Sequence, residues 1–296
     1  MALTIPVKDL EDLEAQVLTA LRTADQSALD VLGYGEVTLV LRICTSQGAF
    51  ACKRLPLFPD RARFERYRNC LTEYLARLGD SGLRVADTAL WHTSTPAGGV
   101  VAYCVQQELP ASSLCDTLLR SRDDEWAHDF FKRFLDCVDR VVSPVLGLDG
   151  QAANWVDVDG ELIYLDVTTP LMRDARGRER LDVRLFFTSL PWALRDAARI
   201  SMSRSICDKF YDPRGVVLDF LGNLHKERLS RLVPSFLAEA NTKLTVPITA
   251  AEVASYYRGD ARMWELVQRL RRADRIWQRH VRRRPYPFLL PPAISR

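Results

Sequence analysis

The sequence predicts an α+β protein, with a small five-stranded antiparallel sheet and one helix in its first part and a larger, mostly helical second part. Short β-branched segments with alternating polarity occupy residues 28–55 and 84–107, and a charged helical pattern separates them. After Pro110 apolar residues recur at helical spacing instead. We therefore expect two units, residues 1–109 with the sheet and residues 110–296 with most of the helices.

The first unit is predicted to open with an amphipathic helix over residues 7–24, where apolar residues follow a helical period. A second helix is expected over residues 60–78, with Asp60 as its N-cap. Strands are expected where β-branched residues alternate with polar ones, at 28–33, 36–44, 49–55, 84–92 and 99–107.

The second unit is predicted to contain one hairpin among helices. Residues 154–158 and 161–167 alternate around Asp159-Gly160, a dipeptide that strongly favours a tight hairpin turn. The helices, one of them broken before Pro234, are expected at 112–120, 124–142, 180–199, 213–240 and 249–284.

The composition is that of an ordinary globular protein. The 296 residues are 47% hydrophobic and 27% charged, and 41 basic against 38 acidic residues leave a net charge of +3. This balance gives no reason to expect a nucleic-acid partner. Seven scattered cysteines without a C-x-x-C pair favour reduced thiols. With no secretory leader pattern and no apolar run of membrane-spanning length, the sequence predicts a cytoplasmic protein without a transmembrane segment.

Two features of the first unit are suited to a phosphate. Gly33 and Gly35 lie between two predicted strands, where backbone N–H groups can approach an anion, although a plain β-turn also explains them. Lys53 is one of only six lysines and stands in an apolar run, where burial requires an anion. A carboxylate of the following helix, Glu73 or Glu65, would serve, and the helix-to-strand spacing favours Glu73. Alternatively, Lys53 reaches solvent from an edge strand.

Three polar residues surround the predicted hairpin. Asn154 follows Asp149 by five positions and precedes Asp166 by twelve, so the hairpin can bring the three together. Carboxylate and amide oxygens suit Mg²⁺, which also takes substrate phosphates as ligands. The simpler alternative is that Asp149 forms a turn and Asp166 a cap.

The order of these motifs resembles that of the protein-kinase-like superfamily over roughly residues 28–240, and most closely its aminoglycoside and choline phosphotransferase branch. The shared order is a glycine-rich loop, a strand Lys, a helix Glu, an Asp-x₄-Asn loop and a metal-binding Asp. The resemblance implies a bilobal fold and the ATP- and Mg²⁺-dependent transfer of the γ-phosphate to a hydroxyl of a small molecule or peptide.

The resemblance also implies a role for each motif. Gly33 and Gly35 would cover the phosphates, and Lys53, oriented by Glu73, would hold the α- and β-phosphates. Asp149 would orient and deprotonate the acceptor hydroxyl. Adenine would meet backbone groups of Gln107, Glu108 and Leu109. The ligands of Mg²⁺ would be Asn154 and Asp166.

Three positions depart from the family pattern. Thr38 replaces a third glycine, Gly147 stands two positions before Asp149 where a His is usual, and the D-F-G motif reads Asp166-Val167-Thr168. These departures motivate an alternative function, a pseudokinase that binds nucleotide or a partner without phosphotransfer. A third alternative is other ATP chemistry on a peptide.

The C-terminal stretch from Arg258 to Arg296 holds eleven Arg against three acidic residues, with apolar residues at helical spacing. A basic amphipathic helix suits an acidic partner or an anionic lipid surface. A last packed helix with a solvated outer face explains the same pattern.

Overall fold

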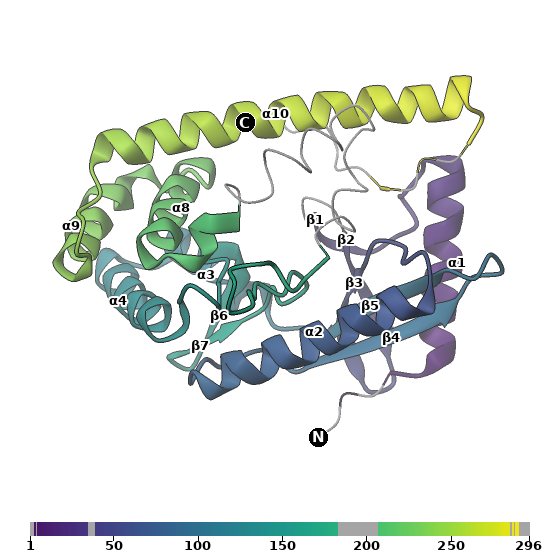
Figure 1. Ribbon diagram of the computed structural model, residues 1–296, viewed down its shortest axis with the longest axis horizontal. Helices are drawn as coiled ribbons and strands as arrows, with labels where there is room; N and C mark the ends of the chain where they lie inside the picture. Colours follow the sequence, from purple (N-terminus) through teal and green to yellow (C-terminus); the bar gives the residue numbers. More distant parts are fainter. Residues whose placement is uncertain are drawn as a thin grey trace.

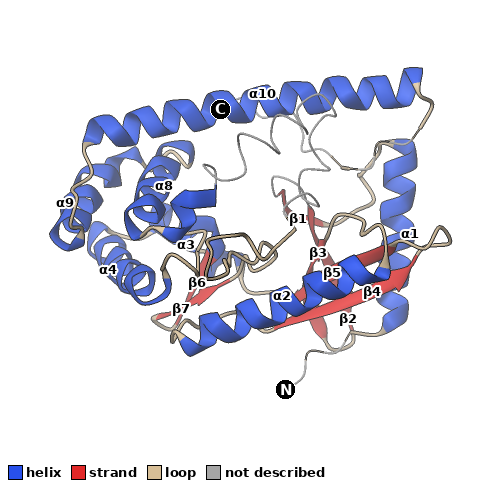
Figure 2. Cartoon of the chain, in the orientation of Figure 1, coloured by secondary structure: helices blue, strands red, loops and turns tan. Residues whose placement is uncertain are grey.

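The computed structural model describes residues 3, 5–34, 39–182 and 207–284, together with 286, 288 and 289. Within these residues the chain is an α+β protein with a five-stranded and a two-stranded antiparallel sheet, as Figures 1 and 2 show. Gly35, Thr38 and most of the helix expected over 180–199 lie outside the described residues.

The five-stranded sheet has the strand order β1-β2-β3-β5-β4, and every neighbouring pair is antiparallel. The predicted strands are confirmed, with boundaries that move by a few residues. Their bounds are β1 Val31–Tyr34, β2 Leu39–Thr45, β3 Gly48–Arg54, β4 Thr88–Ser94 and β5 Val100–Gln107.

A helix packs on each face of this sheet. Helix α1 (Val7–Thr23) and helix α2 (Arg61–Asp80) confirm the two helices expected in the first unit, and Asp60 caps α2 by accepting a hydrogen bond from the backbone N–H of Arg63 at 2.7 Å. Alternate residues of β5 face opposite ways, so Val101 and its companions form a core with α1. Ala102 and Cys104 belong to the second core, which includes α2 and the helical part of the molecule.

A buried ion pair attaches α1 to the sheet. The Arg54 guanidinium at the end of β3 donates from Nε and Nη2 to the two carboxylate oxygens of Glu14, both at 2.8 Å. The Tyr103 hydroxyl donates to the same carboxylate at 2.6 Å. Since strand side chains alternate, Lys53 points to the other face of the sheet, toward α2 and the helical part.

The helical part contains the predicted hairpin. Strands β6 (Trp155–Val158) and β7 (Glu161–Tyr164) pair around Asp159 and Gly160, whose φ angles are 53° and 85°. Positive φ at both turn residues is the requirement that Asp-Gly meets. The surrounding helices are α3 Cys115–Ser121, α4 Asp124–Val141, α8 Pro213–Lys226, α9 Val233–Lys243 and α10 Ala250–Ile276.

The helix expected over 213–240 is broken before Pro234, as predicted. Helix α8 ends at Lys226, because Arg228 adopts a left-handed φ of 60° and the Leu229 N–H returns to the Leu224 carbonyl at 2.7 Å. Pro234 lies just after the break, in the first turn of α9, where a proline is tolerated.

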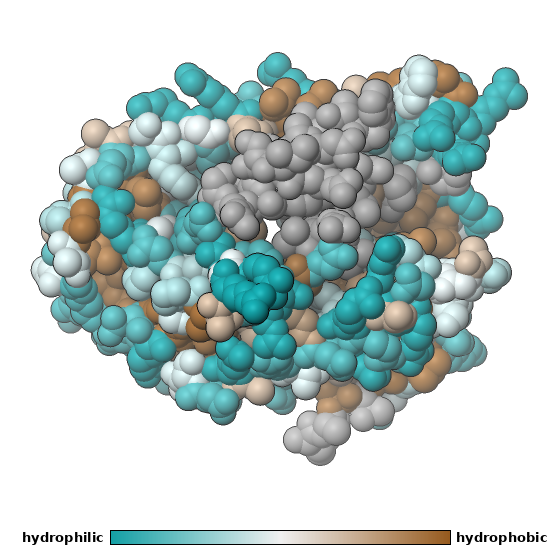
Figure 3. Space-filling model, viewed as in Figure 1, coloured by the Kyte–Doolittle hydropathy of each residue, from teal (hydrophilic) through white to brown (hydrophobic). Residues whose placement is uncertain are grey.

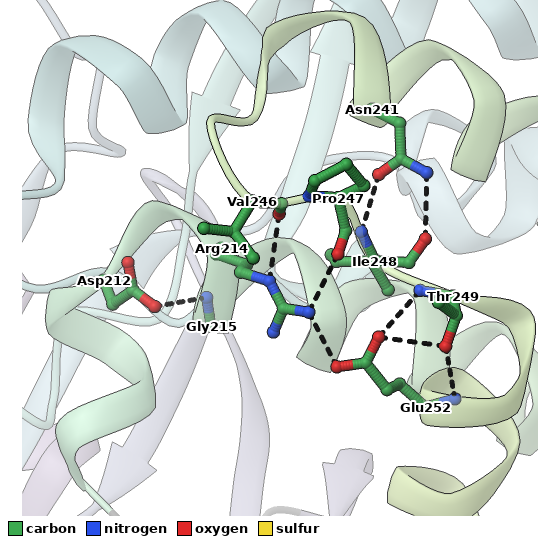
Figure 4. A network of polar contacts seen from close by, with 9 residues as sticks. All are labelled: Asp212, Arg214, Gly215, Asn241, Val246, Pro247, Ile248, Thr249 and Glu252. Carbon is green, nitrogen blue, oxygen red and sulfur yellow. Dashed lines mark hydrogen bonds and ion pairs between the residues drawn. The ribbon is translucent and has the colours of Figure 1, made fainter.

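The start of α10 is fixed against α8 by the network in Figure 4. Thr249 caps α10 and shares a reciprocal capping box with Glu252. Arg214 of α8 donates to Glu252 at 2.7 Å and to the carbonyl oxygens of Val246 and Pro247, each at 3.0 Å. These contacts set the direction in which α10 leaves α9.

Helix α10 ends at Ile276 and continues as a π-helical turn over Trp277–Val281, rather than running unbroken to residue 284 as expected. It extends from α9 across the molecule toward α1, as Figure 1 shows. At that far end Arg279 donates to the Thr23 carbonyl of α1 at 3.3 Å. A single helix therefore connects the helical part with the α1 side of the sheet.

Two further observations concern thiols and the surface. All seven cysteines are free, and all but Cys44 and Cys207 are buried. Burial raises the pKa of the Cys52 thiol to about 12, so this group stays protonated. On the face shown in Figure 3, hydrophilic side chains predominate and apolar ones are scattered. Among the described helices, none has the length and apolarity needed to traverse a bilayer.

Candidate functional site

Lys53 and Asp166 form an ion pair that connects strand β3 with the segment after β7. The Lys53 Nζ atom lies 2.8 Å from Oδ1 of Asp166, although the residues are 113 positions apart. The Thr168 hydroxyl donates to the same oxygen at 2.9 Å. Burial alone would raise the pKa of Asp166, but the Lys53 ammonium and the Thr168 donors outweigh it and hold the pKa below its usual range. The carboxylate is therefore ionised.

The expected partnership of Lys53 with a carboxylate of α2 is wrong. Glu73 pairs with Arg77 at 2.8 Å and with Arg180, while Glu65 pairs with arginines of its own helix. The physical reason is the orientation of α2, whose apolar and aromatic face is buried and leaves both carboxylates on its outer side. Lys53 instead finds its anion in Asp166.

Two buried tyrosines of α2 hold the backbone around the site. The Tyr67 hydroxyl donates to the Thr168 carbonyl at 2.9 Å, and the Tyr74 hydroxyl donates to the Gly147 carbonyl at 3.0 Å. One bond lies two residues after Asp166, and the other two residues before Asp149. Helix α2 thus positions both acidic segments through phenol hydroxyls, which sequence reasoning missed.

Packing requires a glycine at position 147, two residues before Asp149. A Cβ added at Gly147 would lie 2.9 Å from the Phe210 carbonyl oxygen and 3.0 Å from the Leu171 Cβ, so no larger side chain fits. The next residue, Leu148, donates its N–H to that same Phe210 carbonyl at 3.0 Å. The position where the kinase pattern has a histidine is here closed by the segment at Phe210.

Asn154 stands between the two acidic residues, as the spacing predicted. It lies in a short 3₁₀ turn, Ala152–Asn154, and its Nδ2 donates to the Asp149 carbonyl at 3.2 Å. Its own carbonyl accepts from the N–H of Leu165, the residue before Asp166, at 2.9 Å. The structure therefore brings Asp149, Asn154 and Asp166 into one region.

The oxygens of this region suit a hard cation. Within the described part of the chain, Oδ2 of Asp166 and Oδ1 of Asn154 have no hydrogen-bond partner. No cluster of three or more His, Cys, Asp or Glu side chains forms a metal site among the described residues. A carboxylate and an amide fit Mg²⁺, which completes its shell with water and substrate phosphates.

Asp149 has the most strongly perturbed acidity of the site. Burial raises the pKa of its carboxyl, the negative charges of Asp219 and Asp166 raise it further, and Lys209 lowers it, with a net value of about 7. A carboxyl with this pKa exchanges a proton near neutral pH, as a general base must.

A second ion pair, which sequence reasoning missed, lies next to Asp149. Lys209 donates to Oδ1 of Asp219 at 2.7 Å and to the Tyr256 hydroxyl at 2.6 Å, and the Tyr256 hydroxyl also donates to Asp219. The three residues come from the 3₁₀ turn Lys209–Tyr211, from α8 and from α10. The scarcity of lysine was the one signal that singled out Lys209.

The residues expected to bind the nucleotide differ in what the structure shows of them. Gly33 lies in β1, where an added Cβ would meet no atom within 4 Å, so glycine is not required by packing there. Gly35 lies outside the described residues. The Glu108 N–H donates to the Ala49 carbonyl at 3.0 Å and its carboxylate pairs with Arg42, so among its backbone groups only the carbonyl remains for the expected contact with adenine.

Of the two neighbours of Glu108, Gln107 belongs to the five-stranded sheet and Leu109 does not. Gln107 ends β5 opposite Phe50. Leu109 makes no hydrogen bond to other backbone groups in the described ranges. Just before them, Gln106 donates from its side chain to the Leu165 carbonyl at 2.9 Å. This contact joins the end of β5 to the residue that precedes Asp166.

Comparison with known proteins identifies one matching family, whose function is unknown. No protein with a curated description matches this sequence. The model of one family, described as a family of unknown function, DUF6206, matches residues 12–275. The match includes Lys53, Asp149, Asn154 and Asp166, the residues of the candidate site. Because it spans most of the 296 residues, the chain belongs to the DUF6206 family.

Proposed function

We propose that this protein is an ATP- and Mg²⁺-dependent phosphotransferase with a bilobal, protein-kinase-like fold formed by residues 1–109 and 110–296. It transfers the γ-phosphate to a hydroxyl of a small molecule or peptide. The observation that carries the proposal is the 2.8 Å contact between Lys53 and Asp166. A strand lysine and an Asp after a hairpin meet at one place, with Asp149 and Asn154 beside them.

The residues divide the work by their chemistry. Lys53 binds phosphate oxygens, and Asp166 and Asn154 hold Mg²⁺, which neutralises charge on the phosphates when bound. Phosphoryl transfer has a loose transition state, so positioning and charge neutralisation dominate catalysis. Asp149 aligns the acceptor hydroxyl and takes its proton late, which its pKa of about 7 favours.

One observation favours the second candidate, a scaffold that binds nucleotide or a partner without transfer. Lys53 lacks the helix carboxylate expected to orient it and is instead paired directly with Asp166. In the scaffold, this pair would serve to hold the two parts of the molecule together.

Calorimetric titration with MgATP, combined with an assay of ATP consumption, tests the proposal. Lys53→Met and Asp166→Ala are expected to lower MgATP affinity by about tenfold or more, through lost charge-assisted contacts. Asp149→Asn is expected to retain binding and lose ATP turnover. The exposed turn residue Asp159 provides the control, since Asp159→Asn should change neither measurement.

The outcomes separate the two candidates. MgATP binding without any turnover in the wild type, across alcohol acceptors and water, supports the scaffold. Absence of MgATP binding to the folded wild type overturns both nucleotide-dependent functions. Unchanged turnover in Asp149→Asn contradicts the role given to that carboxylate.

We also propose that the segment following α10, from Trp277 to Arg284, binds an acidic protein surface. Arg282, Arg283 and Arg284 are exposed, and among the described residues their guanidinium groups have no ion-pair partner. Trp277 and Val281, beside them, expose 50% and 57% of their surface. An acidic model peptide should bind the wild type in a salt-dependent way and a variant with all three arginines changed to Glu weakly. Equal binding by both contradicts this, and preference for anionic vesicles would assign the surface to lipid instead.

A further inference from the structure

In the cluster of Lys209, Asp219 and Tyr256, one N–H donor of Lys209 has no acceptor among the described residues. A lysine ammonium carries three N–H groups. Two of them are directed to Asp219 and Tyr256, at 2.7 and 2.6 Å, and the third has no acceptor among the described residues. The Lys209 side chain is 24% exposed, whereas that of Asp219 is 2% exposed. Within the described residues the ammonium is thus held by two partners, lies 4.7 Å from the centroid of the Phe210 ring, and keeps one N–H without an acceptor.

The charge of Lys209 is permanent under ordinary conditions. Burial lowers the pKa of its ammonium, but the Asp219 carboxylate and the Tyr256 hydroxyl outweigh that effect, and the net pKa lies above the ordinary value. The cluster therefore keeps a cation at a partly buried site, where charges interact more strongly than in bulk water.

Two glycines of α8 make room for this arrangement. A Cβ at Gly215 would lie 2.5 Å from the Lys209 carbonyl oxygen, and a Cβ at Gly222 would lie 2.6 Å from Cδ1 of the Tyr256 ring. Both distances are shorter than real Cβ atoms tolerate. Helix α8 is thus shaped to receive the lysine turn on one side and the α10 tyrosine on another.

The cluster is adjacent to the residues of the proposed transfer site. Phe210, next to Lys209, accepts a hydrogen bond from Leu148, next to Asp149, at 3.0 Å. The charges of Asp219, Lys209 and Asp166 all act on Asp149. Asp149 therefore lies within electrostatic reach of two ion pairs, Lys53 with Asp166 and Lys209 with Asp219.

We propose that Lys209 is an anion-binding subsite that contacts the terminal phosphoryl group of the bound nucleotide beside Asp149. This inference rests on the proposed function. Lys53 serves the phosphates that stay on the nucleotide, while the free N–H of Lys209 serves the group that is transferred. Asp219 and Tyr256 act as positioning residues that fix the direction of the ammonium.

A comparison of ATP with ADP tests this role, because only ATP carries the transferred group. Calorimetric titrations with each nucleotide and Mg²⁺ are made on the wild type, Lys209→Met and Lys53→Met. Lys209→Met should weaken MgATP binding about tenfold to a hundredfold and leave MgADP binding within about twofold. Lys53→Met should weaken both nucleotides.

Two further variants guard against misfolding and a purely structural role. Lys209→Met leaves the buried Asp219 without its cation, so the double variant Lys209→Met/Asp219→Asn, which removes both charges, is measured beside it. Lys209→Arg should restore part of the ATP preference. Lys243→Met is the matched control, since Lys243 forms an ion pair with Asp136 on another surface, and it should leave both affinities unchanged.

The results distinguish failure of this inference from failure of the proposed function. If the wild type binds both nucleotides and the folded double variant keeps the wild-type ratio of ATP to ADP affinity, Lys209 is structural and the inference is wrong. If the folded wild type binds neither nucleotide, the proposed function is overturned, and this subsite with it.

Discussion

The Tyr74 hydroxyl donates a hydrogen bond to the Gly147 carbonyl at 3.0 Å, so a side chain of α2 fixes the backbone two residues before Asp149. Tyr74 is fully buried in the core that α2 shares with the helical part, and Gly147 stands between two residues of that core, Leu146 and Leu148. The bond therefore links the helix that covers the sheet to the segment that carries the proposed base.

Tyr74→Phe is expected to destabilise the fold by about 1 to 3 kcal/mol, because the Gly147 carbonyl would remain buried without this donor. The same change should slow ATP turnover more than it weakens nucleotide binding, since it acts on Asp149. Urea unfolding and steady-state kinetics measure the two effects. Tyr257→Phe, a change on the half-buried surface of α10, is the control and should stay within about 0.5 kcal/mol.

The pKa of Asp149 predicts opposite effects of pH on stability and turnover. Burial and two neighbouring carboxylates raise the pKa to about 7, above that of an unfolded Asp. A raised pKa contributes stability that is present at low pH and is lost as pH rises through the folded value. The wild type should therefore lose stability between pH 5 and pH 8, while turnover, which needs the ionised form, rises through about pH 7.

Asp149→Asn isolates that effect. The variant cannot ionise, so its stability relative to the wild type should increase by about 2 kcal/mol between pH 5 and pH 8. Denaturant unfolding at the two pH values measures the difference. Asp159→Asn, at the exposed hairpin turn, should follow the wild type, and a pH-independent difference for Asp149→Asn would show that burial does not control this group.

Two glycine-to-alanine changes are expected to alter the stability of the fold in opposite directions. Gly222→Ala places a Cβ 2.6 Å from the Tyr256 ring and should cost about 1 to 3 kcal/mol while displacing the hydroxyl from Lys209. Gly259→Ala on α10 meets no atom within 4 Å and should add up to about 1 kcal/mol through helix propensity. Thermal unfolding of both variants checks the pair, and equal shifts would contradict the packing argument.

The Glu14–Arg54 pair predicts how strongly α1 is held to the sheet. Arg54→Met would leave the Glu14 carboxylate, which is 7% exposed, without its cation, at a cost of about 3 to 5 kcal/mol. Arg269→Met is the contrast, because its 3.7 Å contact with Glu265 is exposed and should contribute under about 1 kcal/mol. Chemical denaturation of the two variants should separate them clearly.

Much of the fold could be predicted from the sequence, because its signals are local. The alternation in β2 and β3, the Asp60 cap and the Asp159-Gly160 turn each depend on residues close together in the chain. The gathering of Asp149, Asn154 and Asp166 was also within reach, since one short hairpin closes the distance between them.

The partner of Lys53 could not be predicted in this way. Helical spacing shows which residues of α2 share a face, but packing decides which face turns inward. Here Tyr67 and Tyr74 are buried and Glu73 pairs with arginines outside. Lys209 was missed because its cluster joins residues from three separate elements, and no local pattern relates Lys209, Asp219 and Tyr256 before the chain has folded.

The course of α10 has a mechanical consequence. It starts on α8, where Arg214 binds Glu252, and reaches α1 at its far end, where Arg279 meets the Thr23 carbonyl. Any widening between the sheet and the helical part must then either break the Arg279 contact or bend a helix of 27 residues. The weaker contact should yield first, so the molecule can open by releasing the far end of α10 while the helix stays attached at its α8 end.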